Sequence, residues 1–237
     1  MRPGDLAIEF AKRKNWELRP RNIMVEGDSD VRFFSLANKL YKQETELNLL
    51  GGDISLFACG FGDSGGTPGM LEQLPPLLNI IRTDPDQNGK ILYRVIALVD
   101  NDHPGRSLIR GLTQQYRQLR AFRDIFILNR IFPRTASEPN ALTSQIEKYN
   151  EDWKGLDCEI EDLLGQDLIE LFLEENPNSL RRDPIVMNGR CHYEWTDNAK
   201  GKIFNFTKQY ASLNDITELV EILKSLRFYL GLPAEGI

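Results

Sequence analysis

The sequence is poor in the residues that build disulfide frameworks and zinc sites. Its three cysteines, Cys59, Cys158 and Cys191, are odd in number, lie far apart and include no Cys-x-x-Cys pair. This spacing supports neither a disulfide-stabilised fold nor a zinc site. The chain has only two histidines, and no cluster of Cys and His in the sequence suits zinc or copper.

Long apolar runs are also absent. No stretch approaches the length of about 18 apolar residues that a membrane-spanning helix needs. The N-terminal stretch MRPGDLAIEFAKRK lacks the basic-then-apolar order of a secretory signal. We therefore expect a soluble cytoplasmic protein with no membrane contact. Of its 237 residues, 41% are hydrophobic and 27% charged, so the chain can bury a sizeable core.

Acidic residues exceed basic ones, giving a formal net charge of −6, but the excess is uneven. Residues 1–134 carry a slight basic excess, and the acidic excess belongs to the remainder, where much of it lies between Glu138 and Glu175. A mildly basic first half is compatible with contacts to a phosphate backbone. The net charge therefore does not exclude a nucleic-acid partner.

Strands and helices are predicted to alternate through the first half of the chain. Short apolar runs bounded by turn residues predict strands over 22–26, 53–59, 91–100 and 124–129. Amphipathic spacing predicts helices over 5–14, 28–42, 70–82 and 105–122. This alternation is typical of an α/β fold with a parallel sheet.

The last third of the sequence has a different pattern. It predicts a helix over 159–175, a hairpin over 184–195 around Asn188-Gly189, and helices over 202–210 and 214–230. We expect three consecutive parts: an N-terminal helix or extension, an α/β core, and a C-terminal extension that completes the site, at 1–20, 21–135 and 136–237.

Two of the predicted strands end in acidic residues. Glu26 ends the first strand and precedes Asp28 and Asp30, whereas Asp100 and Asp102 follow the third strand. Ligands of open parallel sheets bind beyond the carboxyl ends of the strands, and paired carboxylates supply the hard oxygen ligands of Mg²⁺ or Mn²⁺. Grouped carboxylates without a cation cost energy through repulsion and desolvation. We predict a divalent-metal site and interpret Asp28 as a helix cap.

These two segments, "IMVEGDSD" and "ALVDNDHPG", together resemble the Toprim domain of topoisomerases, bacterial primases and several nuclease families. The resemblance implies a Toprim-like Rossmannoid fold, with a parallel sheet of about four strands flanked by helices and a mainly helical C-terminal extension. The motifs most resemble those of the OLD-family nucleases, named for an overcoming-lysogenisation defect and often found in phage defence. Glu26 and Asp30 match their Glu-x-x-x-Asp motif, and "GFGDSGG" matches their glycine-rich turn.

Two later segments extend the resemblance. The stretch "CEIEDLL" places Glu161 at the metal-binding glutamate of the OLD family, whereas Glu159 stands where that family usually has a small hydroxyl residue. The stretch "KGKIFNF" matches a family lysine, which is either Lys200 or Lys202. Helix capping explains "CEIED" equally well, and a solvated position remains open for both lysines.

The resemblance implies a metal-dependent endonuclease that hydrolyses phosphodiester bonds of DNA or RNA with two Mg²⁺ or Mn²⁺ ions. The assignment gives Glu26 and Asp30 to one ion. It gives Asp100, Asp102 and Glu161 to the other ion. Glu159 is a further candidate ligand, and Lys202 is the lysine that stabilises developing charge. Because the usual ATPase half of OLD proteins is missing from the sequence, we expect a separately encoded ATPase or other regulatory subunit. Self-association remains open.

Arginines on the helix predicted after Asp102 favour a polyanionic substrate. Arg106, Arg110 and Arg117 are spaced to lie near one helix face, where guanidinium groups would hold phosphates beside the scissile bond. A solvated helix face gives the same pattern.

Other functions remain open. "DNDHPGRSLIR" also resembles the Toprim nucleases that mature ribosomal RNA, which would make structured RNA the substrate. A non-catalytic metal-binding module could instead dock on a partner through an apolar stripe of Leu219, Ile222, Leu223 and Leu226. A phosphoacceptor signalling domain also uses an acidic metal pocket. A topoisomerase or a primase would need further domains.

Overall fold

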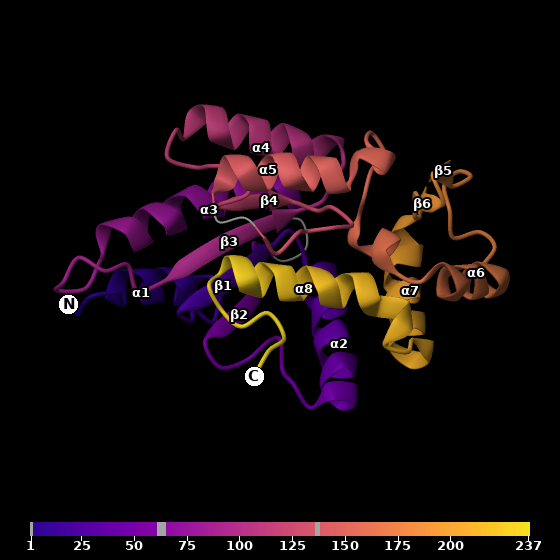
Figure 1. Ribbon diagram of the computed structural model, residues 1–237, viewed down its shortest axis with the longest axis horizontal. Coiled ribbons are helices and arrows are strands. Elements are labelled where there is room, and N and C mark those ends of the chain that lie inside the picture. Colours follow the sequence, from indigo (N-terminus) through magenta and orange to yellow (C-terminus); the bar gives the residue numbers. More distant parts are fainter. Residues whose placement is uncertain (1, 61–64, 136–137) are drawn as a thin grey trace. The chain divides into compact units, whose positions relative to one another are not determined.

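The computed structural model describes residues 2–60, 65–135 and 138–237 (Figure 1). Most of the glycine-rich stretch predicted to form a turn, residues 61–64, lies outside this described part. The backbone gathers into two compact units, each assembled from separate stretches of sequence. Unit 1 comprises Met1–Val31, Leu50–Val99 and Pro104–Ile127, and unit 2 comprises Arg32–Leu49, Asp100–His103 and Leu128–Ile237.

A four-stranded parallel sheet forms the centre of unit 1. Its spatial order is β2 (Ile54–Ala58), β1 (Arg21–Val25), β3 (Arg94–Val99) and β4 (Ile125–Ile127). Every neighbouring pair is parallel. The α/β class and the four-stranded parallel sheet predicted from the sequence are therefore confirmed.

The third strand is shorter than its apolar run suggested. The sequence predicted a strand over 91–100, but β3 begins only at Arg94, directly opposite Arg21 of β1. The residue before β1 is Pro20, whose carbonyl accepts from the Arg94 N–H at 2.9 Å but which has no N–H to extend the pairing, and Ile91 and Tyr93 stay outside the sheet. Ile91 is consequently 48% exposed.

Three helices cover one face of this sheet. They are α1 (Asp5–Arg13), α3 (Gly66–Thr83) and α4 (His103–Gln115), whose first residue alone belongs to unit 2. Leu74 of α3 and Leu112 of α4 join Met24 and Ala97 of the strands in one apolar core. Burial of such side chains is the main favourable contribution to folding.

Helix α4 ends earlier than the sequence predicted. The expected helix ran to about residue 122, whereas α4 ends at Gln115. Phe122 has a φ of 54°, which a right-handed helix does not allow. The Asp124 carboxylate accepts a hydrogen bond from the backbone N–H of Arg120 at 2.9 Å and holds the connection to β4 in a turn.

Helices dominate unit 2, and the helical C-terminal part is confirmed. Helix α2 (Asp28–Thr45) begins in unit 1 and continues here. The other elements are α5 (Pro139–Tyr149), η2 (Glu151–Trp153), η3 (Ile160–Leu163), α6 (Gln166–Glu175), α7 (Asp197–Tyr210), η4 (Asn214–Ile216), α8 (Thr217–Tyr229) and a hairpin of β5 (Ile185–Met187) and β6 (Arg190–His192).

The hairpin was predicted correctly, but the single helix over 159–175 was not. Asn188 and Gly189 have φ values of 46° and 75°, as the Asn-Gly turn requires. The predicted helix is instead the short η3 followed by α6, with a break before Gly165. The N–H of Gly165 donates to the carbonyl of Asp215 at 2.7 Å, and a Cβ on this glycine would lie 3.0 Å from the Asp215 Cα.

The apolar stripe of α8 lies in the protein interior. Leu219, Ile222, Leu223 and Leu226 are each 1% exposed or less. The stripe therefore does not supply the exposed docking surface that a non-catalytic interaction module would need. None of the helices within the described ranges is long and apolar enough to cross a membrane.

A buried guanidinium on α8 anchors two carbonyl groups in unit 2. Arg227 is 1% exposed, and it donates from Nη1 to the Leu49 carbonyl at 2.6 Å and from Nε to the Pro233 carbonyl at 2.8 Å. We predict that Arg227→Met lowers the free energy of unfolding by about 2–4 kcal/mol, because the buried contact to the Leu49 carbonyl and the partly buried contact to the Pro233 carbonyl both lose a charged donor.

Urea unfolding of the purified variants measures this loss. The matched control is Arg181→Met, which removes an exposed ion pair to Asp197 and should cost less than about 1 kcal/mol. Equal losses in the two variants would contradict the anchoring role of Arg227.

Candidate functional site

Unit 1 carries one pair of carboxylates at the carboxyl end of its sheet. Glu26 directly follows β1, and Asp30 lies in the first turn of α2. The Asp30 carboxylate accepts a hydrogen bond from the N–H of Gly27 at 2.9 Å. The interpretation of Asp28 as the helix cap is wrong, because α2 already includes Asp28, which is exposed, and the acid that satisfies the helix end is Asp30.

Both carboxylates act on one buried thiol. Cys59 follows β2, and its Sγ donates to the Glu26 carbonyl at 3.1 Å. Burial, together with the negative charges of Glu26 and Asp30, raises the pKa of this thiol to about 12. The charges of Glu26 and Asp30 therefore both act on this thiol, which stays protonated at neutral pH.

Unit 2 holds a second group of acids. Asn101 and Cys158 exchange two backbone hydrogen bonds, with Asn101 N donating at 2.9 Å and Cys158 N donating at 3.0 Å. This two-residue bridge fixes the segment that follows β3 beside the segment that leads into η3. Asp100 is thereby held near Glu159 and Glu161, although the sequence separates them widely.

A lysine lies among these acids. The Nζ of Lys200, in the first turn of α7, is 2.7 Å from the Glu159 Oε2. Burial alone would lower the pKa of Lys200, but the charges of Glu161, Glu159 and Asp100 outweigh it and raise that pKa above its usual value. We call Asp100, Glu159, Glu161 and Lys200 the acid–lysine cluster. Its lysine carries a full positive charge at neutral pH.

The structure thus separates the two candidate lysines. Lys202 was the lysine chosen for the site, but it is exposed and lines a hollow formed with Glu175 and Ser179. Residues two apart on a helix point in different directions, so only one of the two can face the acids. That residue is Lys200.

The remaining predicted residues lie before, on and after α4. Asp102 is half-buried directly before the helix, and Arg106 and Arg110 belong to its first two turns. The expectation that Arg117 shares their helix face is wrong, because α4 ends at Gln115.

An ion pair that the sequence did not predict orients Glu159. The Asp162 Oδ2 lies 2.7 Å from the His192 Nδ1 and also accepts from the Glu159 N–H at 2.8 Å. The other oxygen, Oδ1, accepts from the Tyr193 N–H at 3.0 Å. Glu159 and Asp162 together form the capping box of η3, each side chain accepting from the backbone N–H of the other residue, and Asp162 also ties η3 to the hairpin. Glu161, in contrast, is 1% exposed and lies near Lys200.

The donor atoms are those that a hard cation prefers. Glu26 and Asp30 in unit 1, and Asp100, Glu159 and Glu161 in unit 2, are all carboxylates, which suit Mg²⁺ or Mn²⁺. Within the described ranges, however, no three or more Cys, His, Asp or Glu side chains are grouped closely enough to hold a metal ion. The chemistry of the donors fits the predicted ions, but these carboxylates are not grouped closely enough in the structure to enclose an ion.

Comparison of the chain with known protein families, curated proteins and solved structures finds no match. The Toprim resemblance therefore remains a prediction from the motifs.

The Asp162–His192 pair predicts a pH dependence of stability. Burial lowers the pKa of His192, but the hydrogen bond and charge of Asp162 outweigh it and raise that pKa above its ordinary value. A raised folded-state pKa stabilises the protein fully below about pH 6.5, and this contribution is lost as the pH rises through the raised pKa. His192→Asn should flatten the fall in unfolding free energy above pH 6.5.

Urea unfolding at a series of pH values from about 5.5 to about 8.5 measures this pH dependence. His103→Asn is the matched control, because His103 is the other histidine of the chain and is exposed on α4. If His192→Asn keeps the pH dependence of the parent protein, the pair does not contribute in this way.

Proposed function

We propose that the protein is a Toprim-type, divalent-metal-dependent endonuclease that hydrolyses phosphodiester bonds of DNA or RNA. The acid–lysine cluster is the observation that carries this proposal. Lys200 contacts Glu159, and the negative charges of Glu161 and Asp100 also act on its ammonium group, so the cluster is net acidic. Bringing carboxylates together costs energy through repulsion and desolvation, and a divalent cation offsets that cost.

The two carboxylate groups have separate roles in the proposal. Glu26 and Asp30 of unit 1 bind one ion, and Asp100, Asp102 and Glu161 of unit 2 bind the other. Glu159 is a further ligand candidate. When bound, such ions activate a water molecule and stabilise charge on the phosphate oxygens.

Lys200 replaces Lys202 as the residue that offsets developing negative charge. Its raised pKa keeps the side chain protonated, so it serves as a positive charge and not as a general base. Its contact with Glu159 also orients that carboxylate. Arg106 and Arg110, on the helix that follows Asp102, contribute contacts to neighbouring phosphates of the substrate.

The biological setting follows from the motif resemblance alone. It favours a cytoplasmic effector of phage defence that works with a separately encoded ATPase. Maturation of structured RNA is the alternative within the same chemistry. The non-catalytic interaction module is less well supported, because the α8 stripe on which it relied is buried.

Cleavage assays with a metal series test the proposed activity. Plasmid DNA, single-stranded DNA and structured RNA are incubated with Mg²⁺, Mn²⁺ or Ca²⁺, and the products are separated on gels. We predict that Lys200→Met and Glu161→Gln each reduce the cleavage rate by about 100-fold or more, the usual cost of removing one group that stabilises the transition state.

Lys202→Met is the matched control, since it removes the same charge two residues away on α7. Its cleavage rate should stay within about threefold of the parent rate. The loss of activity in Lys200→Met would then depend on the position of Lys200 in the cluster and not on the removal of a positive charge alone. Unfolding midpoints of the variants distinguish lost activity from lost structure. Absence of metal-dependent cleavage on every substrate, or equal rates in Lys200→Met and Lys202→Met, would contradict the proposal.

A further inference from the structure

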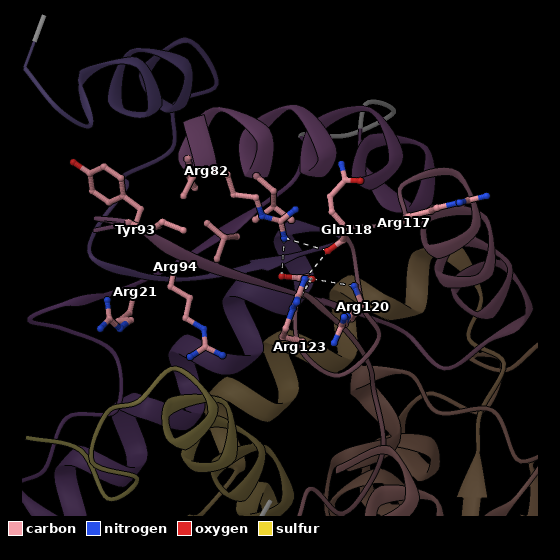
Figure 2. Close-up of a pocket in the computed structure, with 13 residues that line it drawn as sticks. Arg21, Arg82, Tyr93, Arg94, Arg117, Gln118, Arg120 and Arg123 are labelled. Carbon is pink, nitrogen blue, oxygen red and sulfur yellow. Dashed lines mark hydrogen bonds and ion pairs between the residues drawn. The ribbon is translucent and has the colours of Figure 1, made fainter. Parts of the chain in front are cut away.

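The amino ends of the strands in unit 1 border a cavity of about 630 Å³ (Figure 2). Arg21 and Arg94 are the first residues of β1 and β3, and they are direct partners in the register. Arg82 lies in the last turn of α3. The connection from α4 to β4 supplies the remaining arginines of the lining, which are Arg117, Arg120 and Arg123.

Among the described residues that line the cavity, Asp124 is the one acid. Asp124 accepts from the Arg82 Nη2 at 3.1 Å and from the Arg123 Nη2 at 2.6 Å. Figure 2 shows the Arg117 side chain extending away from the other labelled arginines. Within the part of the chain that the structure describes, the side chains of Arg94 and Arg120 form no ion pair. The cavity therefore holds a large excess of positive charge.

Holding these charges together is unfavourable without an anion. Like charges directly opposite one another on neighbouring strands destabilise a sheet, and Arg21 and Arg94 are such a pair. Burial and the charge of Arg21 lower the pKa of Arg94, and Arg123 adds to this effect against the opposing charge of Asp124. Bound phosphate groups would offset the repulsion through bidentate contacts with the guanidinium planes.

The cavity also has an apolar side. Leu78 and Ile81 of α3 and Val95 of β3 line it, and all three side chains are buried. Ile91 and Tyr93, in the segment before β3, complete the lining, and Ile91 is 48% exposed. An exposed aliphatic side chain beside an aromatic ring gives a flat organic group a surface on which to pack.

We propose that this cavity binds a nucleoside polyphosphate, with its phosphates on the arginines and its base against Ile91 and Tyr93. The volume lies within the range of pockets for small molecules, about 300–1,000 Å³. The five residues of β1 span about 17 Å, so the cavity lies far from Glu26 at the other end of the strand. It is therefore a second site, distinct from the carboxylates assigned to hydrolysis.

Isothermal titration calorimetry with the full chain tests the proposal. ATP, GTP and inorganic tripolyphosphate are the probes, and the buffer contains EDTA, so the result does not depend on the carboxylates or on nuclease activity. We expect saturable binding of at least one nucleotide, weakened about tenfold or more in Arg94→Gln/Arg120→Gln. The control, Arg181→Gln/Arg182→Gln, removes two exposed arginines of unit 2 and should change affinity by less than about twofold.

The apolar side has its own variant. Tyr93→Ala should weaken nucleotide binding severalfold and leave tripolyphosphate binding unchanged, because only the nucleotides present a base. Three results would overturn the proposal: no saturable binding of ATP or GTP, equal affinity in the Arg94→Gln/Arg120→Gln variant, or tripolyphosphate binding as tightly as both nucleotides. Binding of a single-stranded oligonucleotide that neither nucleotide displaces would also overturn it, and would identify the cavity as a backbone-binding surface.

Discussion

The parallel pairing of β1 with β3 is the constraint on which the charge distribution of unit 1 depends. It aligns Arg21 with Arg94 at one edge of the sheet and Val25 with Leu98 at the other. Each strand then passes directly into an acid, Glu26 after β1 and Asp100 after β3. An antiparallel pairing would place a strand's acidic end beside its neighbour's basic start. The parallel sheet instead concentrates each kind of charge at its own edge.

The acid–lysine cluster of unit 2 depends on contacts between segments that are distant in the sequence. The backbone bridge of Asn101 with Cys158 brings Asp100 to η3, and the Asp162–His192 pair orients η3 against the hairpin. Lys200 enters from α7. Each of these contacts neutralises or satisfies a polar group that would be costly to bury alone. Stability and the geometry of the proposed site are therefore linked.

The sequence predicted those features that local patterns determine. Apolar runs that end in turns located the four strands, and Asn188-Gly189 located the hairpin. The break at Gly165 was missed because it depends on the approach of Asp215. Helix α5 was missed although its buried residues Leu142 and Ile146 recur at helical spacing. Asp28 was predicted as the helix cap in place of Asp30, because the direction of each side chain depends on where α2 begins.

The choice of Lys200 over Lys202 and the arginine cavity could not come from local patterns. Only the direction of α7 decides which lysine faces Glu159. The arginines of the cavity come from two strands, one helix and one loop, and the strand register brings Arg21 beside Arg94. Of the strip predicted on α4, the sequence correctly placed Arg106 and Arg110 on one helix and extended that helix too far to include Arg117.

The proposed function requires that the net acidic cluster bind a divalent cation. Titration with Mn²⁺, followed by the electron paramagnetic resonance signal of the free ion, measures this binding without any substrate. We expect saturable binding to the parent protein, weaker binding to Glu161→Gln, and unchanged binding to Glu174→Gln, which removes an exposed acid of α6. No saturable binding, or equal binding by all three proteins, would contradict it.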